Sequence, residues 1–123
     1  MPQIKPGNDC GNSPKNLFLQ NLTIAMASGN AQRISRFLTP DVVWQTAGGK
    51  PVSGVEQVCK TITRFGPATL LEIEHVITHG KAGAVNGIVQ FGRKKRAFCH
   101  VYEFSSARGT AVKQITAYAL TLD

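Results

Sequence analysis

The residues best suited to chemistry lie in one short apolar stretch, residues 97–104, which read Ala-Phe-Cys-His-Val-Tyr-Glu-Phe. Successive side chains of a β-strand point to opposite faces, so Phe98, His100, Tyr102 and Phe104 share one face of this predicted strand. An imidazole and a phenol set among aromatic rings are typical of a ligand pocket. His100 and Tyr102 are therefore the candidate catalytic residues, because an imidazole in an apolar pocket can act as acid, base or hydrogen-bond donor near neutral pH.

Both candidates also have a purely structural interpretation. His100 could be a buried histidine bonded to a neighbouring carbonyl or hydroxyl, and Tyr102 a core tyrosine whose hydroxyl reaches the rim of the pocket. Cys99 lies on the opposite face of the strand, so a cysteine–histidine nucleophile is not predicted. The sequence also shows no pair of carboxylates placed for acid–base catalysis.

Metal and cofactor binding are not predicted. His75, His79 and Glu74 are close in the sequence. Strand alternation and a turn separate them, whereas a metal site needs two or three converging ligands. No cofactor-binding motif stands out elsewhere.

Length and composition indicate a single globular domain. The chain has 123 residues, of which 42% are hydrophobic and 17% charged. No window approaches the ~18–20 uninterrupted apolar residues of a membrane span, and the N-terminus lacks the pattern of a signal peptide. Three widely spaced cysteines form no disulfide framework. These features predict a cytoplasmic protein without a membrane partner.

The formal net charge of +7 raises the question of nucleic-acid binding. One dense cluster, residues 93–96 (Arg-Lys-Lys-Arg), falls where a hairpin tip is expected. A solvated turn that protects a sheet edge is favoured over a binding patch. No aromatic residue interleaves with these charges for base stacking, so nucleic acid is not an expected partner.

Helical signals dominate the first half of the chain. Residues 1–13 have no periodic apolar pattern and are predicted to form a flexible arm. Ser13 and Gly29 bound a helix over residues 14–28, and Asn30 caps a second helix that carries Leu38 and ends before Pro40. A third helix is expected to run to residue 65, opened by a capping box of Ser53 and Glu56.

Strand signals dominate the second half. Residues 42–46 predict a short strand, and residues 69–78, 82–91, 96–104 and 111–122 predict a four-stranded antiparallel meander. This order is typical of an α+β protein. Both faces of the meander are apolar, so one is expected to pair with a second copy of the chain. The predicted homodimer face comprises Ile88, Cys99, Val101, Tyr118 and Leu120.

Three segments resemble the nuclear transport factor 2-like superfamily, which includes SnoaL-like polyketide cyclases, ketosteroid isomerases and limonene epoxide hydrolases. They are residues 28–30 (Ser-Gly-Asn) leading to 37–44 (Phe-Leu-Thr-Pro-Asp-Val-Val-Trp), residues 52–56 (Val-Ser-Gly-Val-Glu), and the meander through residues 97–104. Residues 77–87, with 97–99, also resemble a bacterial subgroup whose members mostly lack an assigned activity.

The resemblance implies a single SnoaL-like domain over residues 14–123. Its fold would be a cone-shaped α+β barrel of the cystatin-like kind, with three N-terminal helices packed on a curved antiparallel sheet. The open end of such a cone takes a small, largely apolar molecule, and the convex face pairs in a homodimer. The expected ligand-binding residues are Trp44, Thr46, Phe98, His100, Tyr102, Phe18, Leu22, Ile62, Val89 and Ala117.

The matched positions depart from the known catalytic sets of these families. His100 falls where ketosteroid isomerases carry a protonated aspartic acid, but their general base falls at Thr46 and their oxyanion tyrosine at Leu22. The aspartate of limonene epoxide hydrolases falls near Ala117. Neither reaction is therefore predicted. Two functions remain open: a small-ligand protein or acid–base enzyme (isomerase, cyclase or hydrolase) centred on His100, and a non-catalytic dimeric module that binds a ligand or a protein.

Overall fold

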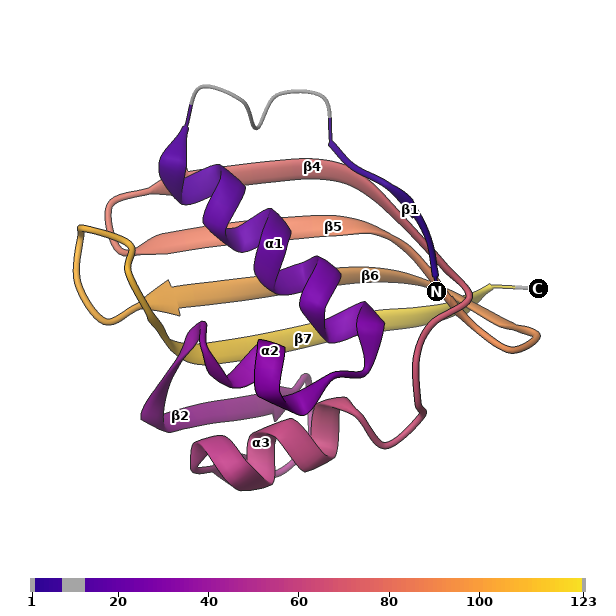
Figure 1. Ribbon diagram of the computed structural model, residues 1–123, viewed down its shortest axis with the longest axis horizontal. Helices are drawn as coiled ribbons and strands as arrows, with labels where there is room; N and C mark the ends of the chain where they lie inside the picture. The colour runs from indigo at the N-terminus through magenta and orange to yellow at the C-terminus, as the bar shows by residue number, and fades with distance from the viewer. Residues whose placement is uncertain (1, 8–12, 123) are drawn as a thin grey trace.

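Three helices lie on one side of a curved seven-stranded sheet (Figure 1). The structure is a computed structural model, and it describes residues 2–7 and 13–122. Across the sheet the strand order is β1 (Gln3–Lys5), β4 (Leu70–His79), β5 (Ala82–Phe91), β6 (Lys94–Phe104), β7 (Val112–Leu122), β2 (Leu38–Thr46) and β3 (Val52–Ser53). The predicted α+β class and the β4–β7 antiparallel meander are confirmed.

Helix α1 (Pro14–Ser28) begins and ends where the sequence predicts. The side chain of Ser13 accepts a hydrogen bond from the backbone N–H of Asn16 at 3.2 Å, which satisfies one of the free donors of the first turn. Gly29 ends the helix with a φ of 72°, a left-handed conformation that glycine adopts without a side-chain clash. Figure 1 shows α1 crossing the sheet in front of its central strands.

Helix α2 (Ala31–Ser35) is shorter than predicted. Its Asn30 cap is present, but Leu38 belongs to strand β2 instead of the helix. The reason is pairing with β7: the backbone N–H of Val112 donates to the carbonyl of Phe37 at 2.9 Å, and Leu38 pairs with Val112. Sheet pairing at this edge therefore overrides the local helical signal.

The predicted capping box at helix α3 (Val55–Ile62) is wrong. Ser53 lies in the short strand β3, antiparallel to β2, and Gly54 occupies the N-cap without a side-chain bond. The helix also ends at Ile62, earlier than residue 65. Arg64 and Phe65 consequently lie in the connection that follows it.

Both edge regions of the sheet contain parallel pairings that the sequence does not predict. Strand β2 pairs parallel to β7, and Gln3–Lys5 form β1, which pairs parallel to β4. Part of the predicted N-terminal arm is thus a strand, whereas residues 1 and 8–12 of it lie outside the described residues. The sheet is therefore mixed, although mostly antiparallel.

The curvature of the sheet has a local cause in β4. The pairing of β4 with β5 shifts between Ile73 and His75, which leaves Glu74 as an extra residue opposite Asn86 and Gly87. A bulge of this kind bends a strand and increases its twist. Gly87 allows the backbones of β4 and β5 to approach closely, because a Cβ at this position would overlap the carbonyl oxygen of Glu72. The bent sheet can then enclose space against the helices.

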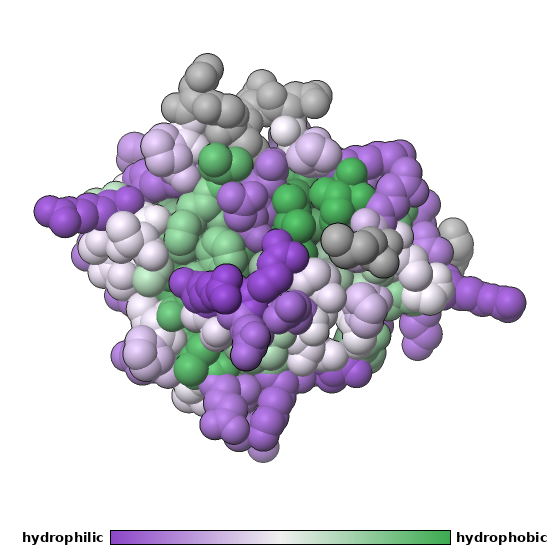
Figure 2. All heavy atoms as spheres, viewed as in Figure 1, coloured by the Kyte–Doolittle hydropathy of each residue, from purple (hydrophilic) through white to green (hydrophobic). Residues whose placement is uncertain are grey.

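The strand alternation predicted for β6 is present. Phe98, Tyr102 and Phe104 are buried on the helix side, whereas Val101 is 40% exposed on the other side. The core they join includes the fully buried residues Leu19, Leu22, Ile34, Val85 and Ile115. On the helix-covered surface, hydrophilic side chains are interspersed with hydrophobic ones (Figure 2).

The basic cluster does not lie entirely in a turn. Strand β6 begins at Lys94, so the turn between β5 and β6 consists of Gly92 and Arg93. Gly92 has a φ of 59°, as a tight hairpin turn requires. Arg96 therefore lies within the strand, on the same face as Phe98.

In the part of the chain that the structure describes, no helix is long and apolar enough to cross a membrane.

Candidate functional site

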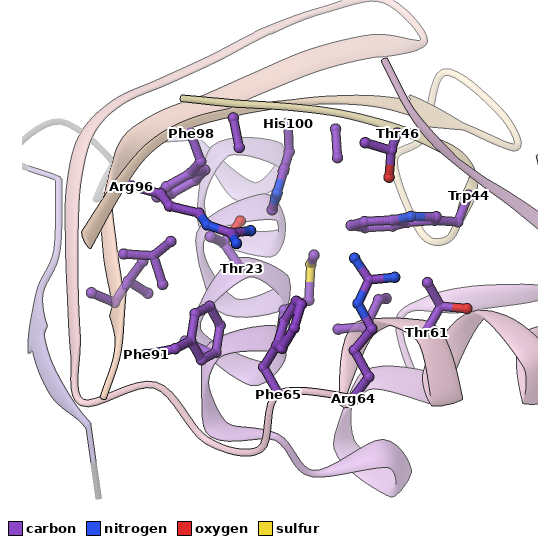
Figure 3. A pocket seen from close by; sticks show the side chains of 17 residues that line it. Thr23, Trp44, Thr46, Thr61, Arg64, Phe65, Phe91, Arg96, Phe98 and His100 are labelled. Atoms are coloured by element: carbon purple, nitrogen blue, oxygen red, sulfur yellow. The ribbon is translucent and has the colours of Figure 1, made fainter. Parts of the chain in front are cut away.

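A pocket of about 140 Å³ lies between the concave face of the sheet, helix α1 and the end of helix α3 (Figure 3). Strands β2, β4, β5, β6 and β7 contribute side chains from the sheet, and α1 contributes Thr23, Met26 and Ala27. Most of the expected ligand-binding residues lie in its lining: Trp44, Thr46, Ile62, Val89, Phe98, His100 and Ala117.

Three expected residues lie elsewhere. Tyr102 and Leu22 are fully buried in the core, outside the lining of the pocket. Phe18 is too far toward the start of α1, where its ring packs against Phe37 and Phe104 at centroid distances of 5.1 and 5.9 Å. Leu22 and Phe18 therefore serve the core, whereas the Tyr102 hydroxyl contacts three lining residues, His100, Thr23 and Met26.

A chain of hydrogen bonds links His100 to the interior. His100 Nδ1 lies 3.1 Å from Tyr102 Oη, which lies 2.8 Å from Thr23 Oγ1 and 3.4 Å from Met26 Sδ. Thr23 Oγ1 in turn donates to the carbonyl of Leu19 at 2.8 Å. Threonine and tyrosine each have one hydroxyl hydrogen, so the direction of the chain can be worked out.

If the Thr23 hydrogen goes to the Leu19 carbonyl, the Tyr102 hydrogen goes to Thr23 or to Met26. In this arrangement Tyr102 Oη is an acceptor toward His100, and Nδ1 carries the hydrogen. The other ring nitrogen, Nε2, is then an unprotonated acceptor. It has no hydrogen-bond partner among the described residues.

Burial keeps this imidazole neutral. Removal from water lowers the pKa of His100 from 6.5 to about 4, because the imidazolium loses more hydration than the neutral ring. Burial also raises the pKa of Tyr102 well above its usual range, so its phenol is not an acid near neutral pH. Among the residues that the structure describes, no Asp or Glu belongs to the pocket lining. Apart from threonine hydroxyls and two arginines, His100 is therefore the one polar side chain that the described lining offers for proton transfer.

Aromatic groups flank His100 on both sides. Figure 3 shows its ring reaching into the pocket between Trp44 and Phe98. The ring centroids are 5.8 Å and 4.9 Å from that of His100, and the Trp44 contact is edge-to-face. Trp44 Nε1 is buried without a hydrogen-bond partner, an arrangement that costs free energy. These rings pack against the imidazole and restrict its orientation.

The residues at the mouth of the pocket were not predicted from the sequence. These are Arg64 and Phe65 after helix α3, Phe91 at the end of β5, and Arg96 in β6. Arg96 could have been found, since residues 96, 98 and 100 alternate onto one strand face. Arg64 and Phe65 carried no comparable signal, because their position depends on where α3 ends.

No metal site is apparent in residues 2–7 and 13–122, where no three His, Cys, Asp or Glu side chains come together. His75 Nδ1 forms a hydrogen bond of 3.0 Å with Asn86 Oδ1, which joins strands β4 and β5. These two residues line a shallow groove on the other face of the sheet, away from His100.

The fold is that of nuclear transport factor 2-like and cystatin-like proteins, as comparison with solved structures shows. An NTF2-like protein of unknown function from Burkholderia xenovorans superposes with a TM-score of 0.77 at 14% identity, covering 89% of this chain and 84% of that one. A protein from Kribbella flavida provisionally named a ketosteroid isomerase has a TM-score of 0.74 at 12% identity, with 89% and 79% coverage.

A third solved structure, a provisionally named SnoaL-like polyketide cyclase from Shewanella denitrificans, has a TM-score of 0.70 at 11% identity, covering 89% of this chain and 92% of that one. The sequence itself identifies the family. The model of the SnoaL-like domain matches residues 19–113, so the chain belongs to the SnoaL-like domain family. No curated protein matches the chain.

Proposed function

We propose that this SnoaL-like protein binds a small, one-ring molecule in the pocket and holds it through a hydrogen bond to His100. The observation that carries the proposal is that His100 lines an apolar, open pocket with Nδ1 engaged by Tyr102 and Nε2 without a partner among the described residues, so that Nε2 is the acceptor of the arrangement above. A ligand hydroxyl or N–H would satisfy this acceptor. The apolar and aromatic lining would contribute most of the binding free energy.

The size of the pocket limits the ligand. An engineered apolar cavity of about 150 Å³ binds benzene. A pocket of about 140 Å³ therefore accommodates one six-membered ring, with any further substituent extending through the mouth. Fused polycyclic substrates such as steroids exceed this volume.

Acid–base catalysis is the second candidate function. It is favoured by the chain from His100 through Tyr102 to Thr23, which fixes the imidazole with Nε2 toward the ligand. However, a base whose conjugate acid has a pKa of about 4 removes protons weakly near neutral pH. The missing carboxylate leaves no partner to complete an isomerase, cyclase or hydrolase cycle. Binding without turnover is therefore the preferred proposal.

The test compares phenol with toluene, which replaces the hydroxyl by a methyl group of similar size. We expect His100→Phe to weaken phenol binding by about 1–3 kcal/mol, the cost of losing a hydrogen bond at a buried site. Toluene binding should change much less, because phenylalanine preserves the aromatic bulk. Trp44 is the single tryptophan of the chain and lines the pocket, so its fluorescence can report both ligands.

Equal losses for phenol and toluene would mean that the substitution only reshapes the pocket, and would contradict the role of His100. If neither compound bound at millimolar concentration, the pocket proposal itself would be wrong. A matched control is His79→Phe, since His79 lies at the end of β4, outside the pocket lining.

We also propose that the protein forms a homodimer through the convex sheet face. This face carries the exposed side chains of Ile77, Val101, Tyr118 and Leu120. Strand pairing makes the patch continuous: Ala97 is opposite Leu120, and Ala97 is also opposite Ile88. The same patch on a second copy would cover these apolar groups, as expected of a symmetric dimer.

A further inference from the structure

Two arginines flank one exposed aromatic ring at the mouth of the pocket. The guanidinium carbon of Arg64 lies 4.7 Å from the centroid of the Phe65 ring, and that of Arg96 lies 5.5 Å from it. Figure 3 shows the two guanidinium groups on either side of Phe65, both turned toward the pocket. They come from distant parts of the chain, the segment after α3 and strand β6.

Neither arginine has an anionic partner in the described part of the chain. The ion pairs found there join Lys5 to Glu72, Lys60 to Glu56, and Lys113 to Glu103. The described lining of the pocket contains no Asp or Glu; Arg96 is half-buried and Arg64 is exposed. Two like charges are thus brought to the same opening without a described carboxylate to balance them, and both would attract an anion that binds there.

The stacking of the two arginines on Phe65 leaves their guanidinium N–H groups available to a ligand. A guanidinium that lies over a ring still has its N–H edge free, and this edge matches the two oxygens of a carboxylate. The interior of the pocket differs from its mouth, because the interior presents mainly apolar side chains and the neutral His100. The pocket is therefore divided into an apolar chamber and a cationic mouth.

We propose that the ligand is a small cyclic or aromatic monoanion, with its ring in the chamber and a carboxylate between Arg64 and Arg96. This inference rests on the proposed binding of a one-ring molecule and adds the charge of that molecule. The alternative is that the arginines only hold Phe65 in place. Phe65 also packs against Phe91 at a centroid distance of 5.8 Å, so its ring has a partner besides the arginines.

The test compares benzoate with benzamide, its neutral counterpart of nearly the same shape. At low ionic strength the unsubstituted protein should bind benzoate at least about tenfold more tightly than benzamide, and added salt should reduce this preference. Arg64→Gln and Arg96→Gln should each weaken benzoate binding about five- to tenfold and leave benzamide binding nearly unchanged. Calorimetry and the fluorescence of Trp44 can measure both affinities.

Arg93→Gln is the matched control. It removes the same charge from the hairpin turn, three residues from Arg96 and outside the pocket lining, so benzoate binding should stay within about twofold. An equal loss in all three variants would show a general effect of net charge and overturn the proposal. Equal affinity of the unsubstituted protein for benzoate and benzamide would also overturn it. That result would leave the proposed function intact, whereas failure of phenol, toluene and both of these compounds to bind would reject the pocket itself.

Discussion

Replacing Gly87 with alanine is expected to lower the free energy of unfolding by about 3 kcal/mol or more. A Cβ at this position would overlap the carbonyl oxygen of Glu72 and lie 3.1 Å from the Cα of Ile73. Both are backbone atoms of the paired strand, so no side-chain rotation can relieve the overlap. The β4–β5 pairing would have to open at the bulge that bends the sheet.

Urea unfolding followed by circular dichroism measures this loss. Gly7→Ala is a suitable control, since its added Cβ would come no closer than 3.4 Å to Ile73 and its stability should change by less than about 1 kcal/mol. Because the bulge bends the sheet over the pocket, Gly87→Ala should also abolish phenol binding under conditions where the protein remains folded. A variant as stable as the parent would contradict the close approach at the bulge.

Replacing Leu120 with glutamate is expected to convert the proposed dimer into a folded monomer. Leu120 is 73% exposed in the protomer, so a carboxylate there can stay hydrated when the protomer is alone. In a symmetric dimer the same change buries two like charges at one interface, each costing several kcal/mol. Sedimentation velocity at micromolar concentration should therefore give the mass of one chain for the variant and of two for the parent.

Leu17→Glu provides the control for surface leucines in general. Leu17 is 43% exposed on helix α1, away from the sheet face, and its replacement should leave the dimer intact. A parent protein that sediments as a monomer would contradict the dimer proposal. Dissociation by both substitutions would place the interface elsewhere than on the convex face.

Local signals in the sequence predict the order of elements well. The boundaries of α1 follow from Ser13 and Gly29, whose capping roles depend only on neighbouring backbone groups. The alternation of residues 98, 100, 102 and 104 correctly predicts one face of β6, because a strand that is covered on one side requires it. The SnoaL-like resemblance then supplied the arrangement of these elements in space.

Features that depend on distant pairing were missed or misassigned. Ser53 has the spacing of a capping box, but β3 pairs with β2 and removes it from the helix N-cap position. Leu38 has helical neighbours, but its pairing with Val112 makes it part of a strand. Gln3–Lys5 look unstructured alone and become a strand only because the edge of β4 is available.

The candidate site was predicted only in part, because it too depends on contacts between distant parts of the chain. Trp44, His100 and Ala117 follow from strand alternation once the fold is known. Arg64 and Phe65 reach the mouth only because α3 ends early, which no local signal shows. The identity of the ligand requires knowing which polar atoms remain unpaired, and this depends on the hydrogen bonds of the folded protein.

The proposed ligand site depends most directly on the protonation state of His100, which ¹H–¹⁵N NMR of its ring nitrogens can measure. We expect Nδ1 to carry the hydrogen near neutral pH, Nε2 to be bare, and the ring to titrate with a pKa of about 4. Phenol should shift the Nε2 resonance much more than that of Nδ1. A hydrogen on Nε2, or a pKa near the ordinary 6.5, would contradict the neutral acceptor on which the proposed ligand site depends.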